Sequence, residues 1–366
     1  MLSSPPINSL NRGPWFKLIC GASFGHLPAI RNLAIAYTLA GADCIDVAAD
    51  LAVITATKDG IKVAQKLALA DRHQAYSFTN IPLLMVSLND GTDPHFRKAE
   101  FDPTQCPADC PRPCEQVCPA EAIDSAGVID ARCYGCGRCL PICPLGLITA
   151  RDQTATPSSV LPYVIQADGI DAIEIHTQTG HLADFQQLWA VLAPSADQLK
   201  LLAISCPDGQ ELIPYLRSIH ATITATYAPQ PLPFTLLWQT DGRPMSGDIG
   251  AGTTHAAIKL AEKVLAADLP GYVQLAGGTN HYTVPKLGAR QLLAATSASH
   301  VHGVAYGSYA RVLLAPILAE LDARTDCPGK LEAHPDLLSA AMSIANELVG
   351  QLKGDKVLQR SSIINK

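Results

Sequence analysis

The chain has 366 residues, of which 48% are hydrophobic, and a formal net charge of −6 at pH 7. This length predicts either one large barrel that carries an insertion or two domains. The acidic balance argues against nucleic-acid binding, which requires basic surfaces. No apolar run reaches the roughly 18 residues of a membrane span, and the start MLSSPPINSL lacks the basic and apolar regions of a signal peptide. We therefore expect a cytoplasmic protein.

Short apolar runs rich in β-branched residues alternate with helix-patterned segments along the chain, which is typical of parallel βαβ units. The runs that we interpret as strands are residues 16–22, 44–49, 82–88, 172–177, 199–205, 234–240, 272–278 and 302–308. The predicted helices are residues 28–40, 60–70, 182–192, 210–220, 254–266 and 284–296, and a last helix follows Tyr309. Eight strands joined by crossover helices predict a (β/α)8 barrel, and a doubly wound parallel sheet is the alternative.

A cysteine-rich segment interrupts this alternation after the third predicted strand. We expect the first part of the barrel in residues 1–96, an inserted module in 97–150, the rest of the barrel in 151–323, and a C-terminal helical segment with a tail in 324–366. Loops that follow barrel strands lie at the C-terminal end of the barrel, where such enzymes place their chemistry. The module is therefore predicted to lie at the barrel mouth.

Eight of the twelve cysteines lie in this insertion, in the runs CPADCPRPCEQVCP and CYGCGRCLPICP. The second run has the C-x2-C-x2-C-x3-C-P spacing of bacterial-type ferredoxins, in which three close thiolates hold one iron-sulfur cluster and the fourth reaches a second cluster. Crossed ligation of this kind predicts two ligand sets, which are Cys118, Cys133, Cys136 and Cys139 for one cluster and Cys106, Cys110, Cys114 and Cys143 for the other.

The first cysteine run departs from the ferredoxin spacing, because three residues rather than two separate its early cysteines. Pro107, Pro111 and Pro113 disfavour a helix through this run, so we expect a loop around the cluster. We expect two 4Fe-4S clusters. A wider loop would hold its iron less tightly, so one of the two clusters can lose an iron to become 3Fe-4S. Tetrahedral zinc is the alternative, although the spacing fits it poorly.

Polar residues recur on one face of several predicted strands. In AIEIHT, alternation turns the two isoleucines outward and Glu174 and His176 inward. The same rule turns further polar residues inward, namely Cys44, Asp46, Ser87, Asn89, Gln239, Asp241 and Gln274. Buried carboxylates are costly unless they are paired or used. These residues therefore indicate either a ligand pocket or a polar network that satisfies itself, with His176 neutral and Glu174 hydrogen-bonded to a neighbour.

Glycines end the last two predicted strands, as Gly277 and Gly278 in LAGGTN and as Gly307 in AYGSYAR. Barrels commonly bind a phosphate through backbone amides at this position, and Arg311 would complete such a site. FMN or another phosphorylated ligand is therefore a candidate for the barrel mouth. The Gly-rich segment 241–258 is then either a lid or a flexible connector. An iron-sulfur oxidoreductase is the alternative function, although no lysine lies at the C-terminal end of a predicted strand to touch a flavin ring.

Residues 16–34, 41–50 and 241–254, together with both cysteine runs, resemble the light-dependent period (LdpA) family of cyanobacteria, over nearly the whole chain. The resemblance implies a cytoplasmic iron-sulfur redox sensor and electron-transfer protein that conveys the photosynthetic redox state to the circadian clock. It implies circadian clock proteins and a sensor histidine kinase as partners, electron-transport components as donors, and the eight cysteines as ligands. It supplies no catalytic residue. Arg112, Arg132 and Arg138, next to ligands, would raise the cluster potentials by stabilising the more negative reduced form.

Overall fold

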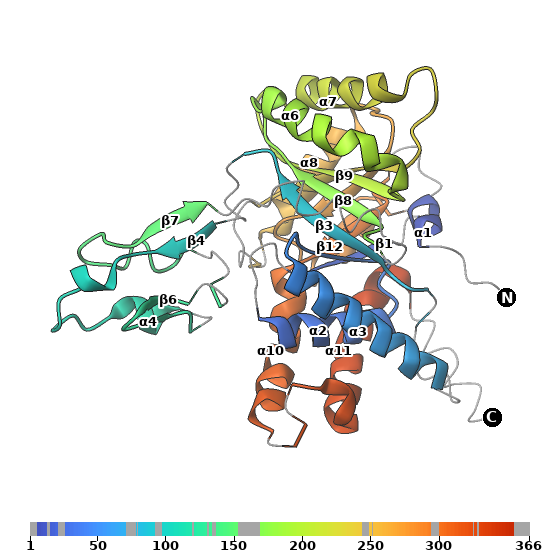
Figure 1. The fold of residues 1–366 in the computed structure, drawn as a ribbon. Helices are drawn as coiled ribbons and strands as arrows, with labels where there is room; N and C mark the ends of the chain where they lie inside the picture. The colour runs from blue at the N-terminus through green and yellow to red at the C-terminus, as the bar shows by residue number, and fades with distance from the viewer. Residues whose placement is uncertain are drawn as a thin grey trace.

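The computed structural model shows a closed barrel of eight parallel strands (Figure 1). It describes residues 6–12, 15–20, 26–70, 78, 80–91, 97–118, 121–129, 132–133, 137–152, 169–243, 249–250, 252–293, 300–324, 326–327 and 329–354. The barrel strands, in their spatial order, are β1 (Trp15–Ile19), β12 (Gly303–Tyr306), β11 (Tyr272–Ala276), β10 (Thr235–Asp241), β9 (Leu201–Pro207), β8 (Ala172–His176), β3 (Leu83–Asn89) and β2 (Cys44–Ala48). Because β1 pairs with both β2 and β12, the sheet closes. The predicted barrel is confirmed.

Helices follow the strands and cover the outside of the barrel (Figure 1). They are α2 (Leu27–Leu39), α3 (Leu51–Ala70), α6 (Leu182–Leu192), α7 (Leu212–Tyr227), α8 (Thr254–Leu265), α9 (Thr283–Ala289), α10 (Ser308–Ala323) and α11 (Pro335–Lys353). Three predicted boundaries are wrong. Helix α7 continues to Tyr227 rather than ending at residue 220. Helix α3 begins at Leu51 rather than at Gly60, with the carboxylate of Asp50 accepting from the amides of its first turn, and α9 ends at Ala289.

The barrel interior is apolar at its N-terminal end. Inward side chains of the strands form a buried cluster there with Leu10 of α1 (Ile7–Arg12), and the strand residues in it are Trp15, Cys44, Leu83, Met85, Ala172, Leu201, Ala203 and Leu237. Residues of opposite parity, such as Phe16 and Leu18, belong to the larger core between the strands and the outer helices. Helix α1 therefore closes the bottom of the barrel, and polar inward residues are left to the end where ligands bind.

Asp43 ties three elements together at this closed end. Its carboxylate accepts from Ser9 Oγ and from the amide of Phe16, each at 2.8 Å, and it pairs with Lys353 Nζ at 2.7 Å. Burial raises the pKa of Asp43, which Lys353 opposes. The last turn of α11 is thereby fastened to α1 and to the start of β1.

The cysteine-rich insertion forms a separate small unit. Strand β4 (Arg97–Glu100) pairs antiparallel with β7 (Thr149–Asp152), and between them lie α4 (Pro113–Val117), β5 (Ile123–Asp124) and β6 (Gly127–Val128). This unit has its own core, which contains Ala99, Ala122, Ile123, Ile148 and three cysteines. In Figure 1 it projects from the side of the barrel opposite α1, so it lies on the side of the mouth. Strands β3 and β8, which flank the insertion in the chain, are neighbours in the barrel.

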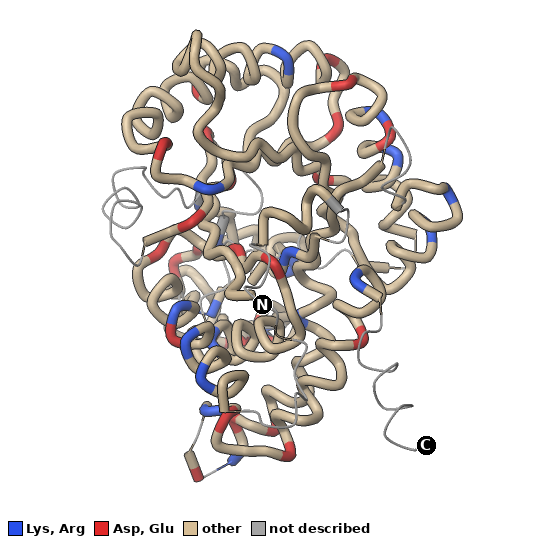
Figure 2. The backbone as a smooth tube through the Cα atoms, turned by 90° about the vertical axis from the view of Figure 1, so that its right-hand side faces the viewer, with Lys and Arg blue, Asp and Glu red and all other residues tan. Residues whose placement is uncertain are grey.

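Charged positions are distributed over the whole molecule. Figure 2 shows Lys and Arg scattered among Asp and Glu on the tube of the backbone. Among the described helices, none is both long and apolar enough to cross a membrane.

The close packing of α3 on α2 gives a test of the barrel wall. A Cβ added at buried Gly60 would lie 2.4 Å from the carbonyl oxygen of Arg31, whereas one added at Gly288 of α9 would meet nothing within 4 Å. We expect Gly60→Ala to lower the free energy of unfolding by roughly 1–3 kcal/mol, because the helices must separate. Gly288→Ala should leave it unchanged or raise it by up to about 1 kcal/mol. Urea unfolding measures both, and equal effects would contradict the packing described here.

Candidate functional site

Seven of the eight predicted cluster ligands lie in the described part of the module, and Cys136 lies outside it. All seven are free thiols. Cys114, Cys133 and Cys139 are buried in the core of the module, and the other four are half-buried. Within the described residues, no three His, Cys, Asp or Glu side chains converge tightly enough to chelate a single metal ion. A cubane takes one thiolate per iron, so its ligands stand further apart than those of one ion.

The thiols predicted for one of the two clusters influence one another electrostatically. Desolvation, a hydrogen bond with Cys110 and the proximity of Cys114 raise the pKa of Cys106. Desolvation and then the charge of Cys143 raise the pKa of Cys114, against backbone amides that lower it. Thiols that lie this close to one another resist ionising at the same time, unless a cation compensates their negative charges. A metal centre supplies that compensation, so this donor set fits iron.

Backbone amides point at several of the sulfur atoms. Ala122 N lies 3.2 Å from Cys118 Sγ, and Ala99 N lies 3.4 Å from Cys133 Sγ. At Cys143, desolvation raises the thiol pKa, but the amides of four following residues outweigh it and lower the pKa, in the order Leu147, Leu145, Ile148 and Gly146. Amide donors of this kind stabilise thiolate over thiol and tune the potential of a bound cluster. The module therefore fits the predicted clusters in its backbone as well as in its cysteines.

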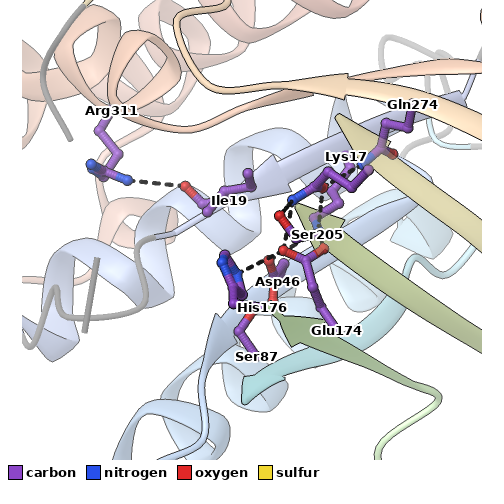
Figure 3. A network of polar contacts seen from close by, with 10 residues as sticks. Lys17, Ile19, Asp46, Ser87, Glu174, His176, Ser205, Gln274 and Arg311 are labelled. Atoms are coloured by element: carbon purple, nitrogen blue, oxygen red, sulfur yellow. Dashed lines mark hydrogen bonds and ion pairs between the residues drawn. The ribbon is translucent and has the colours of Figure 1, made fainter. Parts of the chain in front are cut away.

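A second set of functional side chains lies inside the barrel, around a lysine that sequence reasoning missed (Figure 3). Lys17 of β1 has no exposed surface. Its Nζ contacts Glu174, lies 3.0 Å from Asp46 Oδ2 and donates to Gln239 Oε1 at 2.9 Å. Phe16 and Leu18 of β1 face outward. Side chains alternate along a strand, so the rule that turns Glu174 inward on its strand would also have turned Lys17 inward.

The carboxylates around Lys17 differ in their acidity. Burial raises the pKa of Glu174, but Lys17 and a 2.9 Å contact with His176 outweigh it and hold the pKa at about 2. At Asp46, burial outweighs the effect of Lys17 and raises the pKa to about 6, although Ser87 Oγ donates to its carboxylate at 2.7 Å. Glu174 is therefore an ionised partner of Lys17. Asp46 is the carboxylate that takes up a proton more readily.

Two glutamines and a serine extend this network across the barrel. Gln239 Nε2 donates to Glu174 Oε1 at 2.6 Å and to Ser205 Oγ at 3.1 Å, and Gln274 Nε2 donates to Gln239 Oε1 at 2.6 Å. Figure 3 shows Glu174, Ser205 and Gln274 lying around Lys17. The structure thus brings together six of the predicted interior residues as a largely self-satisfied network, namely Asp46, Ser87, Glu174, His176, Gln239 and Gln274.

The residues predicted for a phosphate site lie differently. Gly277 and Gly278 have φ of +66° and +81°, and a Cβ at Gly277 would lie 1.8 Å from Asp241 Oδ1, so a carboxylate rests on this turn. Arg311 donates to the carbonyl of Ile19 at 3.1 Å and to Ser308 Oγ at 2.9 Å, next to Gly307. A carboxylate repels a phosphate, so this geometry lends the phosphate site no support and it stays a prediction. Of the proposed lid, residues 244–248 and 251 lie outside the described residues.

Removal of the buried cation tests the network. We expect Lys17→Met to lower the free energy of unfolding by roughly 3–5 kcal/mol, because it leaves the buried carboxylates of Glu174 and Asp46 without their lysine. Lys200 is the matched control, because it pairs with Asp171 at 2.5 Å while its side chain is 60% exposed. Lys200→Met should cost about 1 kcal/mol or less. Chemical denaturation at pH 7 measures both, and a Lys17→Met protein as stable as the control would refute the buried charge pair.

Two family models and a curated relative match this chain. Residues 106–154 match the LdpA Fe-S cluster-binding domain, and residues 164–351 match the light dependent period A C-terminal domain. The chain is 53% identical over 353 residues to light dependent period A of Synechococcus elongatus, covering 96% of this chain and 95% of that protein. Among solved structures, (S)-3-O-geranylgeranylglyceryl phosphate synthase from Thermoplasma acidophilum is 10% identical, with coverage of 93% of this chain and 97% of that one. Its TM-score of 0.34 supports no structural conclusion. On the family models and the curated relative, the chain belongs to the light dependent period A (LdpA) family of iron-sulfur-binding proteins.

Proposed function

We propose that this protein is a redox sensor and electron-transfer protein whose iron-sulfur clusters convey the photosynthetic redox state to the circadian clock. The module would hold two 4Fe-4S clusters, one on Cys118, Cys133, Cys136 and Cys139 and the other on Cys106, Cys110, Cys114 and Cys143. The second cluster would lose an iron to form 3Fe-4S. Bound clusters supply one-electron oxidation and reduction.

The backbone amides that surround the Cys143 thiol are the observation that supports this proposal. Four backbone amides favour the thiolate there, although the residue is only half-buried. Solvent exposure and hydrogen bonds to sulfur are two of the protein features that tune cluster potentials. A ligand with both properties suits a cluster that exchanges electrons with partners at the protein surface.

Arg112 supports tuning of the same cluster by charge. A hydrogen bond to Glu115 makes the largest contribution to the raised pKa of the Arg112 guanidinium. Cys106 and Cys110 lie close enough to raise this pKa further. Arg112 Nη1 lies 2.8 Å from Glu115 Oε1. Arg132, another of the three predicted arginines, donates to the carbonyl of Glu121 at 3.3 Å. We therefore assign the electrostatic role to Arg112.

The wider setting follows from the family. The name of the Synechococcus relative refers to a light-dependent period. We propose that photosynthetic electron carriers reduce the clusters in the cytoplasm, and that circadian clock proteins and a sensor histidine kinase bind the protein according to the oxidation state of its clusters.

Loss of one ligand tests the cluster assignment. After anaerobic purification we expect about eight iron atoms and eight sulfides per chain. Cys143→Ser should lose between one and four irons, and EPR should show the change in one cluster only. Cys327 is an exposed cysteine outside the module, so Cys327→Ser should keep the full iron content. A colourless protein that contains zinc or no metal would refute the proposal.

The role of Arg112 is tested by potentiometry. Arg112→Gln should lower the midpoint potential of one cluster, by an amount on the order of 50 mV, because the reduced form loses a stabilising positive charge. Arg217 on α7 of the barrel gives a matched control, since it is an exposed arginine that donates to a barrel carbonyl. Arg217→Gln should leave both potentials unchanged. Equal potentials in all three proteins would show that Arg112 does not tune the clusters.

A further inference from the structure

One buried amide in the barrel stands apart from the network around Lys17. Asn89 is the last residue of β3 and is only 7% exposed. Neither its Oδ1 nor its Nδ2 has a hydrogen-bond partner within the described residues. Burying an amide without hydrogen bonds costs free energy. A position that carries this cost is a candidate for binding, because a ligand can supply the partners.

The carboxamide of Asn89 points into the barrel mouth. Ser87, two residues earlier on β3, faces inward and donates to Asp46. Strand side chains alternate, so Asn89 shares the inward face of Ser87 and lies one step nearer the mouth. Its register partner on β8 is His176, which joins the network through Glu174. The amide therefore lies above the polar network, on the side from which a ligand enters.

Three other buried amides use both their oxygen and their nitrogen, whereas Gln274 donates through Nε2 and has no partner for Oε1 within the described residues. Gln239 accepts from Lys17 and donates to Glu174. Asn280 donates to the carbonyl of Gly250 and accepts from a backbone amide. Asn32 donates to the carbonyl of Gly329 and accepts from the amide of a later residue. These three amides each join separate segments of the chain by hydrogen bonds. Asn89 makes no such hydrogen bond within the described residues.

The charges around the mouth limit what can bind. Asp46, Glu174 and Asp241 bring three buried carboxyl groups to this half of the interior, and Lys17 is already engaged by the first two. An anionic ligand in this half of the interior would face the three carboxyl groups, and Arg311 is a positive charge beside Gly307 at the end of β12. A carboxamide with donor and acceptor side by side matches a neutral edge that offers a carbonyl next to an N–H.

We propose that the barrel mouth binds an uncharged planar heterocycle with an imide edge, which pairs its N–H with Asn89 Oδ1 and its adjacent carbonyl with Asn89 Nδ2. Uncharged flavins and pyrimidinediones carry this edge. The inference is independent of the clusters, because it concerns the barrel alone.

Titration of the full-length protein with two probes tests the proposal. The probes are riboflavin, followed by its fluorescence, and thymine, followed by calorimetry. At least one should bind more tightly than about 1 mM. Methylation of the imide nitrogen of that probe should weaken binding by roughly 10- to 100-fold, because the N–H can no longer pair. Asn89→Leu should weaken binding of the unmethylated probe to the same extent.

Unfolding measurements on two variants separate binding from folding. Asn89→Leu removes an unpaired buried amide, so the ligand-free protein should be as stable as the parent or more stable. Asn32→Leu removes a paired amide, so it should lower stability and leave probe binding unchanged. The proposal is overturned if neither probe binds, if methylation of the imide has no effect, or if Asn89→Leu binds like the parent. Measured iron content in each sample keeps this outcome distinct from failure of the clusters.

Discussion

A fully buried ammonium group organises the interior of this barrel. Lys17 would be prohibitively costly to desolvate alone, and two carboxylates and a glutamine oxygen around it compensate that cost. The carboxylates in turn need donors, which His176 and Ser87 supply. One charge thus accounts for most of the polar residues that strands β2, β3, β8 and β10 turn inward. It also divides the interior into an apolar half, closed by α1, and a polar half that opens toward the module.

Much of this architecture could be predicted from the sequence, because strands with β-branched runs and the helices between them have distinct periodicities. The start of α3 could not be predicted, because a glycine often marks the end of a helix. Gly60 instead lies inside α3, where the absence of a side chain lets α2 pack closely against it. Lys17 was missed because the first strand was interpreted from its apolar residues. The carboxylate of Asp241 on the turn at Gly277 depends on the spacing between two strands, which no local pattern encodes.

The module and the barrel obey different physical rules. The barrel is stabilised by a large apolar core between strands and helices. The module buries few apolar side chains, and cysteines form a substantial part of its core. Small units of this kind usually need a metal or crosslinks for stability. The spacing of the cysteines was visible in the sequence, whereas the amides that point at Cys118, Cys133 and Cys143 depend on the folded backbone.

The insertion between β3 and β8 also orders events during synthesis. These strands pair side by side, yet Leu84 and Asp171, which bond across them, are 87 positions apart in the chain. The ribosome must therefore complete every cysteine of the module before β8 emerges and the barrel can close. A nascent chain that has been made as far as Asp152 thus carries three barrel strands and all eight cysteines of the module, before the remaining barrel strands exist.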